Sequence, residues 1–165
     1  MISPIKTLYI VRHAKSAWTE TANGDIDRPL NERGMSDAPM MAKRFAERAE
    51  PVDLWITSTA LRARSTAAFF AKELGLEAPQ ELPSLYLAPA STLLATLNAF
   101  PKSVKSAMIF GHNPGLSLLA DDLAQSGLGD LPTCAVIRID FDATDWEEVV
   151  NGEGSLVWWD TPKQG

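Results

Sequence analysis

Residues 7–16 read Thr-Leu-Tyr-Ile-Val-Arg-His-Ala-Lys-Ser, and this stretch carries most of the information about the fold. Its first five residues are apolar, aromatic or β-branched, which predicts a short buried strand over 7–11. The strand leads directly into a polar segment that begins with Arg12 and His13. Polar groups at the end of a buried strand are typical of the ligand-binding edge of an α/β sheet.

The same pattern recurs twice farther along the chain. A predicted strand over 52–57 precedes the segment that contains Arg62, and a predicted strand over 106–110 leads into His112. His13 and His112 are the chain's two histidines, and they lie 99 residues apart. Because parallel neighbouring strands end at the same edge of a sheet, we expect both histidines to meet there.

Longer stretches with the apolar pattern of helices separate these strands. We expect helices over 30–49, 61–74, 90–100 and 114–124, and two further strands over 135–141 and 155–159, the last at a sheet edge. Asn31 is a predicted N-cap, and Gly75 is the predicted end of the second helix. Pro39 predicts that the first helix either kinks there or begins late, near Ser36.

Strands that alternate with helices predict right-handed crossovers. The expected fold is therefore a three-layer α/β/α sandwich with a mostly parallel central sheet. The length of 165 residues and the 45% hydrophobic content predict a single globular domain over 1–165.

Composition excludes several classes of protein. One cysteine, Cys134, cannot form an internal disulfide, so a disulfide-stapled secreted domain is excluded and a reducing cytoplasm is expected. The net charge of −6 disfavours nucleic acid and anionic membranes as partners. We find neither a signal peptide nor an apolar run of about 18 residues.

The residues at the three strand ends predict a pocket for a tetrahedral dianion. Arg12 and Arg62 offer forked, permanently charged donors that match phosphate oxygens. A neutral His13 could attack phosphorus, and His112, which would act best as a cation, could stabilise the transition state. This scheme requires no cofactor. Each residue alone could equally be a hydrogen-bonded loop residue or a solvated cation, so the hypothesis depends on their joint occurrence.

Four blocks in order resemble the histidine phosphatase superfamily. Val-Arg-His-Ala-Lys-Ser at 11–16 resembles its Arg-His-Gly signature, with Ala14 in place of the glycine. The other three blocks are Asp-Arg-Pro-Leu-Asn-Glu-Arg-Gly at 27–34, Ser-Thr-Ala-Leu-Arg-Ala-Arg-Ser-Thr-Ala at 58–67 and Gly-His-Asn-Pro-Gly at 111–115. The Arg-Pro-Leu and Gly-His-Asn-Pro-Gly motifs look most like the bacterial phosphohistidine phosphatases of the SixA-like branch.

This resemblance implies a phosphoglycerate mutase-like fold and phosphoryl transfer through a phosphohistidine enzyme intermediate. It implies that His13 is the nucleophile. It also implies a phosphate clamp formed by Arg12, Arg62 and His112. Arg28 is expected to reach the pocket from its loop. We also predict that Ser16 and Asn113, which lie close to the two histidines in sequence, contact the substrate. The expected partner is a phosphorylated protein of the histidine-phosphotransfer type or a small phosphorylated molecule.

The sequence departs from the family where mutase-like relatives carry a glutamate as general acid. The corresponding stretch, Leu-Pro-Ser-Leu-Tyr-Leu-Ala at 82–88, has no carboxylate, and Asn113 stands where the acid phosphatase branch has an aspartate. An alcohol leaves poorly without a proton donor, whereas a phosphorylated imidazole protonated on its other nitrogen departs as neutral imidazole. The missing acid therefore favours phosphohistidine as substrate.

Other functions remain open at this point. A phosphomonoesterase acting on a small ester is the main alternative, and mutase activity is disfavoured by the missing acid. A module that binds phosphorylated ligands without turnover would have no need of His13. A zinc site on the two histidines is disfavoured by the flanking arginines, and a dinucleotide-binding domain by the lack of a Gly-x-Gly-x-x-Gly motif after the first strand.

Overall fold

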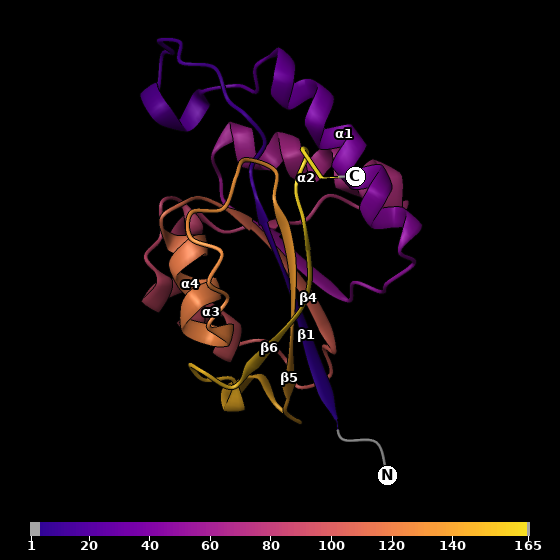
Figure 1. The fold of residues 1–165 in the computed structure, drawn as a ribbon. Helices are drawn as coiled ribbons and strands as arrows, with labels where there is room; N and C mark the ends of the chain where they lie inside the picture. The colour runs from indigo at the N-terminus through magenta and orange to yellow at the C-terminus, as the bar shows by residue number, and fades with distance from the viewer. Residues whose placement is uncertain (1–3, 165) are drawn as a thin grey trace.

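The computed structural model describes residues 4–164 and contains one six-stranded sheet (Figure 1). The strands lie in the order β3-β2-β4-β1-β5-β6. Their bounds are β1 Ile5–Arg12, β2 Leu54–Thr57, β3 Gln80–Glu81, β4 Ser106–Gly111, β5 Val136–Asp142 and β6 Gly154–Asp160. The two-residue edge strand β3 has too short an apolar pattern to be predicted from sequence.

The sheet is mixed, with its parallel part at one side. β1, β4, β2 and β3 run parallel to one another, whereas β5 pairs antiparallel with β1 and β6 antiparallel with β5. The parallel part contains the three strands whose ends carry the predicted site. Strand β6 lies at an edge, as predicted.

Helices cover both faces of the sheet, which confirms the predicted three-layer sandwich. In β1, Tyr9 and Val11 face the core formed with α1 (Glu32–Glu47) and α2 (Leu61–Leu74). Leu8 and Ile10 face the opposite core, formed with α3 (Ala90–Asn98) and α4 (Gly115–Ala124). Figure 1 shows α1 on one side of the sheet and α3 and α4 on the other. The alternation of side chains along a strand accounts for these two cores.

The helix boundaries follow local signals closely, with one exception. Asn31 caps α1 by accepting a hydrogen bond from the Gly34 N–H at 2.9 Å, and Gly75 ends α2 with φ +64°. The alternative start of the first helix near Ser36 is wrong, because α1 begins at Glu32 and Pro39 lies inside it. The cap and the buried apolar face of α1 outweigh the backbone hydrogen bond that proline removes.

The terminal strand places its two tryptophans on opposite faces, as alternation requires. Trp158 packs near Tyr9 and Phe45, whereas Trp159 is exposed. Among residues 4–164, no helix has the length and apolar composition that crossing a membrane would require.

Candidate active site

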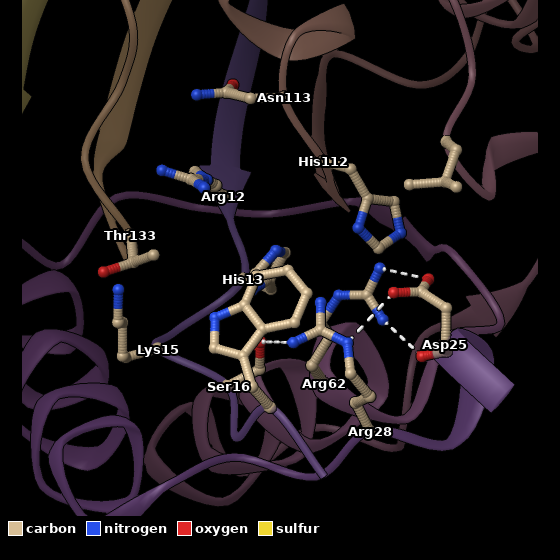
Figure 2. A pocket seen from close by; sticks show the side chains of 12 residues that line it. Arg12, His13, Lys15, Ser16, Asp25, Arg28, Arg62, His112, Asn113 and Thr133 are labelled. Atoms are coloured by element: carbon tan, nitrogen blue, oxygen red, sulfur yellow. Dashed lines mark hydrogen bonds and ion pairs between the residues drawn. The ribbon is translucent and has the colours of Figure 1, made fainter. Parts of the chain in front are cut away.

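A cavity of about 280 Å³ lies at the carboxyl ends of β1 and β4. Arg12 pairs with Gly111 in the parallel register of these strands, so the residues that follow them emerge side by side. The ring centroids of His13 and His112 are consequently 5.3 Å apart. Figure 2 shows the residues that line the cavity: Arg12, His13, Lys15, Ser16, Trp18, Asp25, Arg28, Arg62, Leu87, His112, Asn113 and Thr133.

His13 is held through its backbone and through one ring nitrogen. Its N–H donates to the Gly111 carbonyl at 3.1 Å, and its own carbonyl accepts from the Cys134 N–H at 3.0 Å. Nδ1 lies 2.7 Å from the Ala14 carbonyl oxygen, which can only accept, so Nδ1 carries the proton and Nε2 keeps its lone pair. Burial, together with nearby positive groups, lowers the pKa of His13 to about 3. The imidazole is therefore neutral at pH 7, as a nucleophile must be.

His112 presents one ring nitrogen to the cavity. Its Nε2 lies 2.7 Å from Ser58 Oγ, which itself accepts from the Ala60 N–H. Burial first, and then the charge of Arg62, lower the pKa of His112 to about 4. The expected cation is thus neutral at pH 7 without a bound anion. A proton on Nδ1 still permits donation into the cavity, because the Ser58 hydroxyl can donate to Nε2.

The two arginines of the predicted clamp are anchored to the protein by their terminal nitrogens. Arg12 Nη1 donates to the Leu131 carbonyl at 2.8 Å. Arg62 donates from Nη1 to the Asp25 carbonyl at 2.8 Å and from Nη2 to the Asp25 carboxylate at 2.9 Å. These anchors fix the direction of each guanidinium.

Three buried side-chain nitrogens have no hydrogen-bond partner among the described residues, and all three belong to residues that line this cavity. They are Arg12 Nε, Arg62 Nε and His112 Nδ1. A buried polar group without a partner costs free energy, so such groups are rare away from binding sites. A tetrahedral oxyanion in front of His13 would accept hydrogen bonds from these nitrogens.

Asp25 is the one lining residue of this cavity with a carboxylate, and sequence analysis assigned it no role. It lies in the short 3-10 turn Gly24–Asp27, where it accepts hydrogen bonds from Tyr86, Arg28 and Arg62. These hydrogen bonds, that of Tyr86 first, hold the pKa of Asp25 well below its usual range. The one available signal was its position three residues before Arg28, a spacing that one helical turn brings together.

The remaining predicted residues also reach the cavity. Arg28 is buried, and its Nη1 donates to Ser16 Oγ at 2.9 Å. Asn113 lines the cavity, but its amide donates to the Leu131 carbonyl and its oxygen accepts from Ser117. Its contacts therefore fix the loop after β4.

Residues outside the predicted catalytic and substrate-binding set also line the cavity, among them Trp18, whose position just after the His13 segment predicts that it borders the pocket mouth. Trp18 is 84% exposed and lies over the Arg28 guanidinium, whose carbon is 4.0 Å from the ring centroid. Lys15, Leu87 and Thr133 complete the rim. Among residues 4–164, no three side chains of His, Cys, Asp or Glu lie together as ligands for a metal ion.

Comparisons with known proteins agree with this geometry. A model of the histidine phosphatase superfamily (branch 1) matches residues 8–85. An uncharacterised protein of Mycobacterium tuberculosis is 32% identical over 166 residues, which cover 93% of this chain and 100% of that protein.

Two solved structures share the fold over nearly the whole chain. The Agrobacterium tumefaciens protein assigned as phosphohistidine phosphatase SixA superposes with a TM-score of 0.81 at 27% identity, covering 95% of this chain and 98% of that one. The protein histidine phosphatase SixA in complex with tungstate gives 0.80 at 24% identity, covering 94% and 97%. The chain therefore belongs to the histidine phosphatase superfamily, and its structure resembles the SixA phosphatases within it.

Proposed function

We propose that the protein hydrolyses phosphohistidine on another protein, through a covalent phosphohistidine formed on His13. The observation that carries this proposal is the convergence of three partnerless buried nitrogens in the cavity that also holds His13. All three belong to residues that line this cavity, so a phosphoryl group bound there would offer oxygens as their acceptors. Permanently charged donors at this position stabilise the negative charge of phosphoryl transfer.

The reaction would proceed in two displacements. His13 Nε2 forms a bond to phosphorus while the bond between phosphorus and the substrate's ring nitrogen breaks, and the leaving ring keeps the proton on its other nitrogen. Water then attacks the phosphorylated His13, the new N–P bond breaks, and inorganic phosphate leaves. The hydrogen bond from His13 Nδ1 to the Ala14 carbonyl holds Nε2 in line during both steps.

The state of Asp25 favours this substrate over an alkyl ester. Because the pKa of Asp25 is well below its usual range, the carboxylate stays ionised at neutral pH and has no proton to give an alkoxide. A positioned acid contributes about 100-fold or more to the departure of a poor leaving group. The leaving group of a phosphohistidine is an imidazole, whose reference pKa is about 6.5, so it departs as a neutral ring without that acid. This difference between the two leaving groups disfavours the alternative function, a phosphomonoesterase.

A substrate profile tests the proposal. We expect kcat/KM for a phosphorylated histidine-phosphotransfer domain or a phosphoramidate to exceed that for an alkyl phosphate by about 100-fold. p-Nitrophenyl phosphate, whose leaving group needs no acid, reports whether the site itself works. His13→Ala should abolish turnover of all three, and mass spectrometry of acid-free quenched protein should detect the phosphorylated form only in the wild type. Equal kcat/KM on the alkyl ester and the phosphoramidate would favour the ester phosphatase.

A further inference from the structure

A second cavity adjoins the active site on the side away from Asp25. It has a volume of about 300 Å³ and shares Arg12, Lys15 and Thr133 with the first. In Figure 2 these three residues lie on the left, across the site from Asp25. Arg33 and Lys163 complete its charged lining, and we call it the basic cavity. A protein ligand bound at His13 would therefore have its neighbouring residues close to the basic cavity.

Three separate segments of the chain bring cations to the basic cavity. Lys15 lies in the loop after β1, where its carbonyl accepts from the Asn31 N–H at 3.0 Å, and Arg33 lies in the first turn of α1. Lys163 follows β6, and Arg44 fixes this segment by donating to the Thr161 carbonyl at 3.0 Å. Figure 1 shows the C-terminus returning to α1. The convergence is thus fixed by the fold.

The charge of the basic cavity is unbalanced. None of its lining residues is acidic, although the whole chain has 21 acidic and 15 basic residues. Lys15 and Lys163 form no ion pair among the described residues, and Arg33 reaches only Asp37, at 3.3 Å on an exposed surface. Asp130 acts electrostatically on Arg12. The four lining cations outnumber these two carboxylates, so they repel one another and a bound anion relieves that repulsion.

The rim of the active site indicates how large the ligand is. Trp18 is 84% exposed and Leu87 is 54% exposed, and both line the active-site cavity. Large apolar side chains beside a charged pocket are typical of surfaces that contact another macromolecule. A phosphorylated protein would cover them, whereas a small phosphate ester would not.

We infer that the basic cavity binds carboxylates of the phosphorylated protein next to its phosphohistidine, and so selects substrates with acidic residues around the phosphorylated site. The inference rests on the proposed function, because it specifies which phosphoproteins reach His13. The attraction acts before and during binding, so its effect belongs in KM more than in kcat.

Two phosphohistidine peptides that differ only in their flanking residues test this inference. One carries glutamates on both sides of the phosphohistidine and the other carries glutamines. With the wild type, we expect KM for the glutamate peptide to be about fivefold lower, since two partly exposed ion pairs contribute modestly. The preference should decrease in the double variant Arg33→Gln/Lys163→Gln, which leaves Arg12 and Lys15 in place, and should vanish in about 1 M salt. Neither Arg33 nor Lys163 lines the active-site cavity.

Controls separate this inference from the proposed function. Lys72→Gln removes an exposed cation in the last turn of α2 and should keep the preference. The double variant should hydrolyse p-nitrophenyl phosphate at the wild-type rate, which shows that it is folded. Calorimetry with the His13→Ala variant, which does not turn the peptides over, measures the dissociation constants of both peptides and so the preference in binding alone.

The outcomes are distinct. Equal KM and equal binding of the two peptides, or an unchanged preference in the double variant, would overturn the inference even if phosphohistidine is hydrolysed. Binding of neither peptide would overturn it as well. If the double variant instead loses only a preference for a bisphosphorylated small ester over a monophosphate, the cavity holds a second phosphate and the assignment to protein carboxylates is wrong.

Discussion

The protonation of the two active-site histidines is set mainly by burial. Both rings are almost completely buried, and Arg12 and Arg62 lie near both of them, while the Asp25 carboxylate partly offsets the arginines at His112. Burial in low dielectric and nearby positive charge both disfavour the imidazolium form. His13 is thereby kept neutral, as the proposed nucleophile must be, and we expect His112 to gain a proton only when a bound dianion offsets the arginines.

Ring titration followed by NMR checks this account. In the ligand-free protein we expect His13 and His112 to show neutral-imidazole shifts from pH 8 down to pH 5, because their pKa values are about 3 and about 4. Saturating tungstate should move the titration of His112 upward and protonate it near neutral pH. A midpoint near 6.5 for either ring in the free protein would contradict the role given to burial.

Asp25 places a fixed negative charge inside a site that binds anions. Its carboxylate orients Arg62 and Arg28, with donor–acceptor distances of 2.9 Å in both cases, yet it also repels a dianion. The two effects of Asp25 act on different steps. Orientation of the guanidiniums favours the reaction itself, whereas repulsion of the dianion weakens binding of the phosphate product.

Replacement of this carboxylate separates the two effects. In Asp25→Asn we expect the inhibition constant for inorganic phosphate to decrease several-fold, because one negative charge is removed, and kcat to decrease because the guanidiniums lose their shared anchor. Asp27→Asn makes the same change of charge two residues away, at a side chain that binds Asn23 and does not line the cavity. Weaker phosphate binding in Asp25→Asn than in Asp27→Asn would show that positioning outweighs repulsion.

At the level of elements, α4 meets the loop before α3 through a glycine. A Cβ at Gly115 would collide with the Ala88 carbonyl oxygen, so only glycine permits this approach. The contact holds the Leu87–Ala88 segment, and hence one side of the active-site rim, against the start of α4. Gly111, in the same motif, has ordinary room, since its Cβ would meet Leu116 at 3.5 Å.

Alanine substitutions at these two glycines should differ. We expect Gly115→Ala to lower the free energy of unfolding by about 1–3 kcal/mol, the usual cost of overpacking, and to raise KM by displacing the rim. Gly111→Ala should cost less in denaturant titrations. A smaller loss for Gly115→Ala than for Gly111→Ala would mean that the helix shifts without penalty.

Local signals predicted most elements but not the directions of all strands. The bounds of α2 and its end at Gly75 follow from apolar spacing and a left-handed glycine. The antiparallel pairing of β5 and β6 could not be predicted, because the apolar pattern of a strand does not indicate its direction in the sheet. Short β3 and the 3-10 turn that carries Asp25 have no periodicity to detect.

The site was predictable to the extent that its residues follow strand ends. Parallel pairing of β1 and β4 is enough to bring His13 and His112 into one cavity. Asp25 and Ser58 depend on tertiary contacts with Arg62 and His112, which no spacing in the sequence specifies. The exposure of Trp18 likewise depends on how its loop lies over Arg28.

For the whole molecule, the buried histidines make stability depend on pH. In the unfolded chain both rings have a pKa of about 6.5, so below that pH the unfolded state binds more protons than the folded state. The free energy of unfolding should therefore be nearly constant between about pH 7 and 8 and decrease as the pH is lowered, by about 1.4 kcal/mol per histidine between pH 7.5 and 5.5.

Urea unfolding at four pH values in this window measures the effect. His112→Gln should remove about half of the pH dependence, because it leaves only one depressed imidazole pKa. A free energy of unfolding that stays the same from pH 7.5 to 5.5 would contradict the low pKa values of both rings.

The backbone of His13 is hydrogen-bonded to Gly111 at the end of β4 and to Cys134 just before β5. His13 is thus held as firmly as the sheet itself and, as the proposed nucleophile, cannot travel toward its target. If the substrate is the proposed phosphoprotein, accommodation must come from that protein or from the loop that carries Trp18. A phosphohistidine on a mobile or protruding helix end would meet this fixed point readily, whereas one recessed in a rigid surface would be excluded whatever its chemistry.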